Sequence, residues 1–202
     1  MYRLYDYLPS GNGYKCRLVL RRLAIPYELV ELDIKAGATR TPEFLAKNPA
    51  GQIPLLEVPG RGHLAQSHAI IEFLARESEL VPRDPYRQAL MRQWMCFEQY
   101  NLEPNLGTAR FWLHSQHRSP ESLGEALKDK HARGRDALRV LEAGLTGRRF
   151  LVGDQYSLAD IALYAYTHVA PEALVPLEPY PAIRAWIGAI EAEPRWQPIT
   201  AR

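Results

Sequence analysis

The chain contains 202 residues with a net charge of +2, and 47% of them are hydrophobic. This composition is typical of a folded globular protein with room for one large domain or two small ones, and it excludes an intrinsically disordered chain. Its 25 basic residues nearly balance 23 acidic ones, so we expect no sequence-independent binding to nucleic acid.

The sequence has no apolar stretch of the roughly 18 residues that a transmembrane helix needs, and its amino terminus lacks the layout of a signal peptide. We therefore expect no membrane partner and a cytoplasmic location. The two cysteines, Cys16 and Cys96, show no Cys-x-x-Cys or Cys/His ligand spacing. We predict neither a disulfide framework nor a metal site.

The first predicted elements form a βαβ unit. Residues 2–7 are rich in aromatic side chains and predict a strand, residues 14–24 predict a short amphipathic helix, and residues 27–32 alternate as a second strand. Two parallel strands need such a crossover. Cys16 is predicted to be a core residue, because the apolar side of the helix carries Cys16, Val19, Leu20 and Leu23 and the polar side carries Lys15, Arg17, Arg21 and Arg22.

A short helix over residues 41–46 follows, and then a β-hairpin whose strands span residues 53–58 and 63–65. Ser67 opens the next helix and is its predicted N-cap. Residues 1–80 therefore combine a βαβ unit with a ββα unit, and we predict that they form one α/β domain.

The character of the sequence changes between residues 79 and 85, where two prolines bracket a charged link and no further strand pattern follows. We predict a second domain over residues 86–202 that is entirely helical. Its predicted helices begin at Tyr86, with a kink at Pro104, and continue over about residues 120–145, 161–169 and 179–192. Asp160 belongs to a capping box, so we assign it to helix capping and not to catalysis.

The loop from Pro9 to Gly13 joins the first strand to the first helix. Its polar residues Ser10 and Asn12 stand at a helix N-terminus, where backbone N–H groups and the helix dipole favour an anion, including a thiolate. An ordinary turn with a helix cap is the alternative, because serine and asparagine favour caps.

Two further segments lie where regular elements meet. Ile53–Pro54 starts a strand; trans is the commoner form of such a bond, but a cis bond would turn the Ile53 N–H and C=O outward to pair with an extended ligand. Gln66–Ser67 combines a hydroxyl with N–H donors, which suits a carboxylate unless the pair is simply a cap. Ligands of open α/β sheets bind at strand ends beside helix N-termini, so we predict that all three segments line one cleft.

Several motifs resemble, in their order and spacing, those of the cytosolic glutathione S-transferases: Thr41–Leu45, Asn48–Leu56, Gln66–Ile70, Gly153–Asp154 and Ser157–Asp160. The resemblance covers essentially the whole chain. It implies a thioredoxin-like α/β domain over residues 1–80 and an all-α helical domain over residues 86–202. Residues 10–15 are similar to the bacterial branches that use Ser or Thr at the active site and not to the Tyr branches.

The resemblance also implies how glutathione, the cosubstrate, is held. The backbone of Ile53, before a cis Pro54, would pair with the cysteinyl part. Gln66 and Ser67 would hold the γ-glutamyl end, and Gln52 would approach the glycyl portion.

The sulfur of glutathione would accept a hydrogen bond from Ser10, helped by Asn12 and the helix N-terminus. Such a bond lowers the pKa of a thiol from its free value of roughly 8.5 and raises the thiolate fraction at neutral pH. The nucleophile then belongs to the cosubstrate and not to the protein.

The sequence departs from the family pattern at three positions. Gln66 stands where many relatives have Glu, which weakens charge pairing with the glutamyl amine. Thr39 stands where some relatives have a His that binds the glycine carboxylate. Position 10 is not a cysteine, which argues against the Cys-dependent thiol-transferase branches.

The same resemblance implies a second pocket, for a hydrophobic electrophile, between the domains near Pro104. Tyr100 and Asn105 are candidate lining residues, although polar side chains there could equally satisfy backbone groups that Pro104 frees. Arg110 and Trp112 could meet an anionic or planar substrate, or pack on each other as plain structure.

The sequence therefore predicts a glutathione transferase, a homodimer as the resemblance implies, in which bound glutathione thiolate attacks an electrophilic small molecule. A glutathione-dependent reductase of disulfides or peroxides is one alternative, which Ser10 and Asn12 resemble in some bacterial members. A non-catalytic binding protein with the transferase fold is another. The intact set of Ser10, Ile53–Pro54 and Gln66–Ser67 argues against that reading, since a scaffold has no need of all three.

Overall fold

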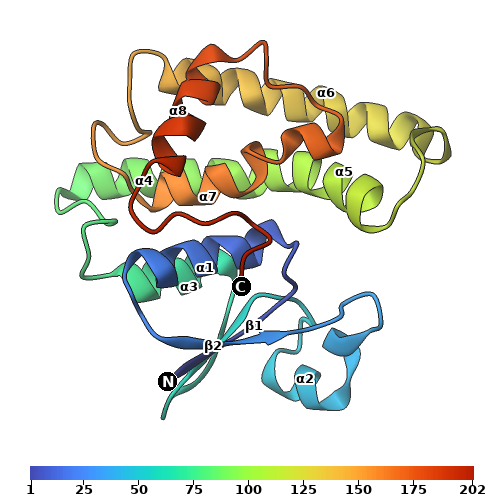
Figure 1. The fold of residues 1–202 in the computed structure, drawn as a ribbon, viewed down its shortest axis with the longest axis vertical. Coiled ribbons are helices and arrows are strands. Elements are labelled where there is room, and N and C mark those ends of the chain that lie inside the picture. Colours follow the sequence, from blue (N-terminus) through green and yellow to red (C-terminus); the bar gives the residue numbers. More distant parts are fainter. The chain divides into compact units, whose positions relative to one another are not determined.

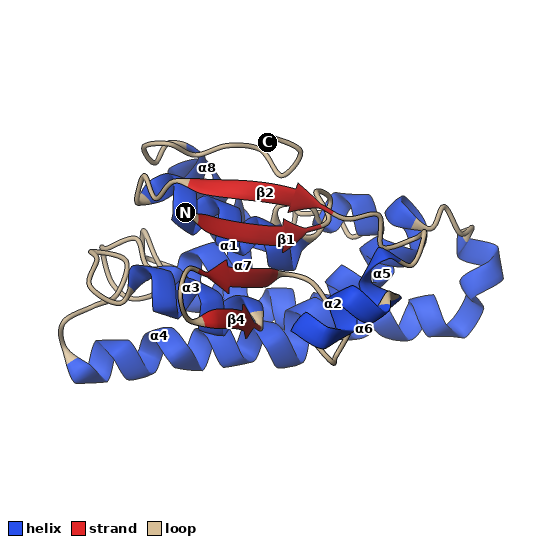
Figure 2. Ribbon diagram, turned by 90° about the horizontal axis from the view of Figure 1, so that it is seen from below, coloured by secondary structure: helices blue, strands red, loops and turns tan.

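A four-stranded mixed sheet forms the centre of the first part of the chain, in a computed structural model that describes all 202 residues. The strand order is β2–β1–β3–β4 (Figure 2). Strand β1 (Tyr2–Asp6) pairs in parallel with β2 (Tyr27–Glu31) and antiparallel with β3 (Leu55–Val58), which pairs antiparallel with β4 (Gly62–Ala65). This is the predicted combination of a βαβ unit with a hairpin.

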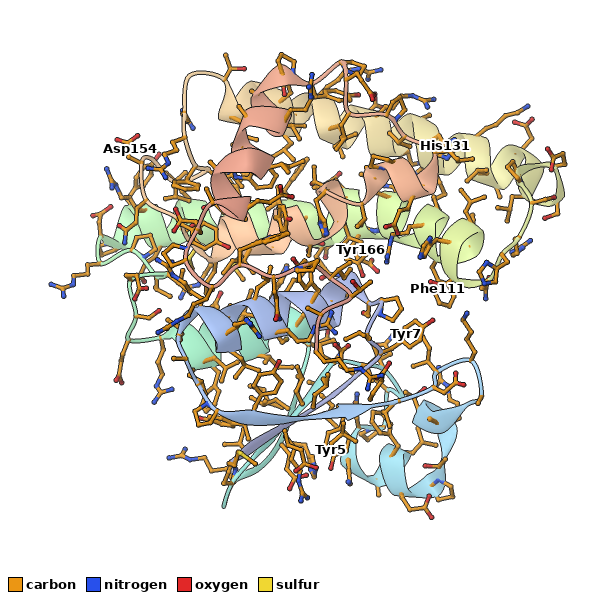
Figure 3. The ribbon with its side chains drawn as sticks, in the orientation of Figure 1. Tyr5, Tyr7, Phe111, His131, Asp154 and Tyr166 are labelled. Carbon is orange, nitrogen blue, oxygen red and sulfur yellow. The ribbon has the colours of Figure 1, made fainter.

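Helices cover both faces of this sheet. Helices α1 (Gly11–Arg22) and α3 (Ser67–Ala75) lie side by side on one face (Figure 1). The short helices η1 (Ala38–Arg40) and α2 (Pro42–Lys47) follow β2. Alternate strand residues point to opposite faces, and Tyr5 points to the side of α2, where it packs edge-on against Phe44 with ring centroids 6.2 Å apart (Figure 3).

The second part of the chain is helical. One long helical run comprises α4 (Pro85–Phe97), the π-helical η2 (Glu98–Gly107), α5 (Thr108–Arg110) and the π-helical η3 (Phe111–Ser115). It is followed by α6 (Pro120–Leu145), α7 (Leu158–Thr167), η4 (Ala170–Ala173) and α8 (Pro181–Glu191). None of these helices combines the length and apolarity that spanning a membrane requires.

Helix α7 is the core of this helical part, and every one of its residues is buried. Its start is the predicted capping box of Ser157 and Asp160, so the assignment of Asp160 to capping is confirmed. The Asp160 carboxylate also accepts hydrogen bonds from the Leu151 N–H and from Trp186 Nε1, both at 2.9 Å. One buried side chain therefore holds a loop, a helix start and α8 together.

The chain divides into two compact units, one of residues 1–78 with 194–202 and the other of residues 79–193. The sequence predicts domains over residues 1–80 and 86–202. The segment from Pro194 to Arg202 packs with the first unit because α1 holds it: Arg17 Nη2 donates to the Ile199 carbonyl at 2.8 Å, and the Tyr14 hydroxyl donates to the Gln197 carbonyl.

Some local predictions were wrong. Helix α1 begins at Gly11 and not at Tyr14, and Lys15 and Arg17, predicted on its polar side, are fully buried. Lys15 donates to the Asn12 side chain there, and Arg17 forms an ion pair with Asp6. Ser67 is the first helical residue of α3 and not its N-cap.

Pro104 does not break its helix. It lies inside the π-helical η2, whose asparagine amides donate to carbonyls one turn earlier: Asn101 Nδ2 to Phe97 O at 3.1 Å and Asn105 Nδ2 to Asn101 O at 2.7 Å. The interruption that the sequence analysis missed is at Gly124 in α6, with φ 50° and ψ −129°.

Candidate functional site

The loop after β1 carries Ser10, the predicted thiol activator. The Ser10 N–H donates to the Tyr7 carbonyl at 2.7 Å, which closes a turn at the end of the strand, where Figure 3 labels Tyr7. Ser10 is the N-cap of α1, and its Oγ accepts from the Gly13 N–H at 3.4 Å. At that distance the cap bond is weak, and the hydroxyl keeps its own proton to donate elsewhere.

A buried ion pair between Asp6 and Arg17 holds this loop in place. Asp6 Oδ2 lies 2.7 Å from Arg17 Nη1, and both side chains are fully buried. Asp6 Oδ1 accepts from the Tyr7 N–H at 2.7 Å, and Arg17 Nη2 donates to the Leu8 carbonyl at 2.8 Å. A side chain at Gly13 would put its Cβ 1.7 Å from Asp6 Oδ1, so only glycine allows this packing.

Opposing effects act on the pKa of Asp6 in this ion pair. Burial raises the pKa of Asp6 to about 7, while Arg17 and the Tyr7 N–H act to lower it. Burial also raises the pKa of the Cys16 thiol far above its ordinary value. Cys16 is buried and protonated, so the prediction that it is a core residue is confirmed.

Asn12 connects the starts of α1 and α3. Its Oδ1 accepts from Lys15 Nζ at 2.8 Å and from Ser67 Oγ at 3.3 Å. Lys15 Nζ also lies 3.5 Å from His68 Nε2. Lys15 is the residue here that the sequence analysis missed; the available signal was its spacing of one helical turn from Asn12.

Strand register brings the remaining predicted residues to the same end of the sheet. Leu55 pairs with Tyr5 on one side and with Ala65 on the other. The residues just beyond this row are therefore neighbours at one end of the sheet. They are Asp6 and Tyr7, Ile53 and Pro54, and Gln66.

The Ile53–Pro54 bond is cis, as the family resemblance implied. Ile53 precedes β3, which begins at Leu55, and neither its N–H nor its C=O has a hydrogen-bond partner within the chain. Gln52 is exposed, and its carbonyl accepts from Asn48 Nδ2 at 2.8 Å. Ile53 therefore presents an open backbone N–H and C=O just before the cis proline.

Gln66 and Ser67 differ in exposure and conformation. Gln66 is exposed and has φ 71°, an unusual backbone conformation for a residue other than glycine. Ser67 is 5% exposed. Residues held in such strained conformations cluster at ligand sites, and each strained residue destabilises the folded state by roughly 1–3 kcal/mol.

Four residues are predicted to line the electrophile pocket: Tyr100, Asn105, Arg110 and Trp112. Tyr100 and Asn105 line a pocket of about 340 Å³ between η2 and α6, and Arg110 and Trp112 are not among its lining residues. Arg110 is buried and its Nε lies 2.6 Å from Glu172 Oε2. The guanidinium over the Trp112 ring belongs to Arg118, at 5.7 Å from the ring centroid.

No group of three or more His, Cys, Asp or Glu side chains is arranged to hold a metal ion. The charged residues near the start of α1 have partners within the protein: Asp6 pairs with Arg17, and Lys15 donates to Asn12. What the arrangement offers a ligand is hydrogen-bond donors at two helix starts, with a buried ammonium behind them, and this suits an anion.

Family comparison agrees with this geometry. The model for "Glutathione S-transferase, N-terminal domain" matches residues 1–76, and the model for "Glutathione S-transferase, C-terminal domain" matches residues 104–194. The chain belongs to the glutathione S-transferase family. A crystal structure of a glutathione S-transferase from Pseudomonas fluorescens Pf-5 is 44% identical and has a TM-score of 0.96, with 99% of each chain covered.

Two other relatives of this glutathione transferase bear on its chemistry. The disulfide-bond oxidoreductase YfcG of Escherichia coli K12 is 29% identical over 93% of this chain and 89% of its own. A glutathione transferase from Burkholderia graminis, solved with two glutathione molecules bound per subunit, is 29% identical with a TM-score of 0.84, over 96% of this chain and 85% of that one. The predicted family and its two-part fold are thus confirmed.

Proposed function

We propose that this chain binds glutathione at the starts of α1 and α3 and activates its thiol for attack on an electrophilic small molecule. The observation that carries the proposal is the Asn12 side chain, whose Oδ1 accepts from Lys15 of α1 and from Ser67 of α3. The Asn12 side chain therefore links two helix N-termini at the end of the sheet where the Ile53 backbone groups have no partner within the chain. That combination suits a thiolate, an extended peptide backbone and a carboxylate together.

The chemistry proposed for Ser10 is hydrogen bonding to the cosubstrate sulfur. The Ser10 hydroxyl is held only by a 3.4 Å cap bond, so its proton is available to a thiolate. Because a hydrogen bond to the charged form favours that form, the thiol pKa falls below its free value of roughly 8.5.

Asn12 supplies a second donor in this proposal. Lys15 and Ser67 both donate to its side-chain oxygen, so that atom is the acceptor and the NH₂ group is turned the other way. The fully buried Lys15 adds positive potential behind the amide. The pair together favours an anion beyond the Asn12 NH₂ group.

The roles of the other glutathione-binding residues are proposed from the resemblance to the family. We propose that the Ile53 backbone pairs with the cysteinyl part, that Gln66 and Ser67 hold the γ-glutamyl end and that Gln52 approaches the glycyl end. Glutathione bound in the Burkholderia graminis relative supports the cosubstrate. The enzyme would work as a homodimer on a hydrophobic electrophile.

The test separates binding from activation. Retention on immobilised glutathione should be lost in Ser67→Ala and kept in Ser10→Ala. In Ser10→Ala, an ultraviolet titration of the bound thiol should give a pKa near the free value, and kcat/KM with an aryl halide should fall roughly tenfold or more at pH 7. Ser122→Ala, at an exposed helix start in α6, is the matched control and should change neither.

Two results would contradict parts of the proposal. A thiol pKa unchanged by Ser10→Ala would transfer the activating role to Asn12 or the backbone. Wild-type protein without any affinity for glutathione would overturn the proposal as a whole.

A glutathione-dependent disulfide or peroxide reductase is the second candidate, favoured by the 29% identity to YfcG. In that reaction two glutathione thiols are oxidised to one disulfide, while the substrate disulfide gives two thiols or a peroxide gives an alcohol and water. Turnover of a mixed disulfide without turnover of an aryl halide would identify this chemistry. Glutathione binding without either turnover would indicate a non-catalytic binding protein.

A further inference from the structure

The turn that carries Ser10 contains a proline at an unfavourable position. The Ser10 N–H donates to the Tyr7 carbonyl at 2.7 Å, so residues 7–10 form a β-turn in which Pro9 is the third residue. The Leu8–Pro9 bond is trans. Proline at the third position of the commonest turn type disfavours the helical conformation that the residue before it needs. Local preferences therefore do not hold this turn, and contacts from elsewhere in the protein are needed.

The Arg17 guanidinium supplies these contacts. Its Nη2 donates to the Leu8 carbonyl at 2.8 Å, and its Nη1 donates to Asp6 Oδ2 at 2.7 Å. Asp6 Oδ1 in turn accepts from the Tyr7 N–H at 2.7 Å. Arg17 therefore fixes the Leu8 carbonyl directly and the Tyr7 N–H through Asp6, and both groups belong to the turn that ends at Ser10.

The C-terminal segment, residues 194–202, holds Arg17 in this position. Arg17 Nη2 also donates to the Ile199 carbonyl at 2.8 Å, and the Tyr14 hydroxyl donates to the Gln197 carbonyl. Figure 1 shows the segment, in dark red, beside α1. Ile199 is 7% exposed and Arg17 is fully buried, so the segment helps to keep water away from the Arg17 guanidinium. The low dielectric of such a site strengthens its ion pair and its hydrogen bonds.

We propose that Arg17 is a positioning residue for Ser10, and that the C-terminal segment, by binding Arg17, determines how firmly the Ser10 hydroxyl is held toward the cosubstrate sulfur. This inference rests on the proposed function, in which Ser10 donates to that sulfur. Arg17 acts through the backbone of the turn and does not touch glutathione. A donor on a fixed turn is already oriented when the thiolate forms, whereas a donor on a loose turn must first be ordered.

The test loosens the C-terminal segment and leaves Arg17 and the turn intact. The double variant Tyr14→Phe/Ile199→Ala removes the hydroxyl that donates to the Gln197 carbonyl and the buried side chain that anchors the segment. In the free protein, we expect the Ser10 amide hydrogen to exchange with solvent about tenfold faster or more, because its bond to the Tyr7 carbonyl opens more often.

The same double variant is then measured with glutathione. Ultraviolet titration should give a higher pKa for the bound thiol, and kcat with an aryl halide at pH 7 should fall about threefold or more. The KM for glutathione should stay within about twofold of the wild-type value, because the proposed contacts at Ile53 and Ser67 remain and the loss is confined to activation.

Arg17→Lys is the second variant, and it tests the same role with the C-terminal segment unchanged. Lysine keeps a positive charge beside Asp6, but its single ammonium does not reproduce the planar fork that reaches two carbonyls as well. We expect the same changes in Ser10 amide exchange and in the thiol pKa. This variant decides the question if the double variant does not fold, and circular dichroism shows which variants are folded.

The matched control is Ile183→Ala, which makes the same isoleucine-to-alanine change at a fully buried position of α8 in the second unit. It lowers stability without changing any residue of the Arg17 contacts, so Ser10 amide exchange and the thiol pKa should match the wild type. Equal changes in Ile183→Ala would overturn the proposal, because they would reflect a general loss of stability. Wild-type exchange at Ser10 in the loosened variants would overturn it as well.

The design separates failure of this inference from failure of the proposed function. Ser10 amide exchange is measured without glutathione, so it shows whether the segment orders the turn even if the chain does not bind glutathione. If Ser10→Ala raises the thiol pKa and the loosened variants do not, the positioning role is wrong and the proposed role of Ser10 stands. If Ser10→Ala leaves the thiol pKa unchanged, the proposed activation by Ser10 is itself wrong.

Discussion

The two units each bury an aspartate completely, and they satisfy it in opposite ways. Asp6 in the first unit faces the Arg17 guanidinium at 2.7 Å. Asp160 in the second unit accepts from neutral donors only: the Leu151 N–H, the Ser157 N–H and hydroxyl, and Trp186 Nε1, each at 2.9 Å. Burial raises the pKa of both carboxyls, and the partners act to lower it.

The difference lies in what each carboxylate connects. Asp160 holds the start of α7 against α8 and a loop. Asp6 acts through Arg17, which also binds the Leu8 carbonyl beside the Ser10 turn and the Ile199 carbonyl in the C-terminal segment. A charged pair can thus join distant segments next to a polar site, whereas neutral donors suffice to close a helix start.

The largest effect should come from breaking the charged pair. Arg17→Met leaves Asp6 buried without its cation and frees the Leu8 and Ile199 carbonyls, so we expect a loss of about 3–5 kcal/mol in the free energy of unfolding. Denaturant titration measures it. The double variant Asp6→Asn/Arg17→Met should recover part of that loss; a double variant as unstable as the single one would contradict the pairing argument.

Asp160→Asn should have the next largest effect. An amide NH₂ cannot accept hydrogen bonds, so two of the donors around Asp160 are left unsatisfied in the core, and we expect a loss of about 2–4 kcal/mol. Thermal and denaturant unfolding measure it. Asp154→Asn, an exposed change in the preceding loop (Figure 3), is the control, and an equal loss there would show that the effect is not specific to the buried network.

A half-buried histidine, His168, extends the comparison of the two units to the pH dependence of stability. The pKa of His168 is lowered from 6.5 to about 4, mainly by burial and in smaller part by Arg110, while the hydrogen bond to the Tyr164 carbonyl and the Glu172 charge act to raise it. The native state therefore favours the neutral ring. Its contribution is complete above pH 6.5 and is lost as the pH falls through about 4, by at most about 3 kcal/mol.

In the wild type the rings of His168 and Tyr164 stack with centroids 4.3 Å apart. The variant His168→Phe keeps an aromatic ring at this position, and phenylalanine does not titrate. We expect the unfolding free energy of the wild type to fall more steeply than that of the variant between pH 7 and about pH 4. Parallel pH profiles of the two proteins would contradict the assignment.

Much of the architecture was predictable from local patterns. Periodicity identified both helical and extended segments, and the Ser157–Asp160 capping box identified the start of α7. The motif around Ile53–Pro54 pointed to the cis bond only through the family resemblance, because the local preference of an X–Pro bond is trans. Helical periodicity also misassigned Lys15 and Arg17, because it treats a charged side chain as a solvent-facing one.

The candidate site was predictable in part. Ser10, Asn12 and Ser67 have types and positions that suit helix starts, whereas Lys15 gains its place there only from contacts with Asn12 and His68. Arg110 and Trp112, two of the residues suggested for an electrophile pocket, have partners that the sequence does not reveal: Arg110 pairs with Glu172, and Trp112 packs beside Leu123 and Leu127. Such partners come from distant segments that no local pattern connects.

The sequence by itself determined the family, the α/β and helical parts, and the residue types that could bind glutathione, since these depend on local periodicity and motif spacing. Tertiary structure alone decided which polar groups are buried and which residues form their hydrogen bonds and ion pairs. Asp6 with Arg17 and Asp160 with Trp186 lie 11 and 26 residues apart, and a buried polar group is stable only where folding brings it a partner.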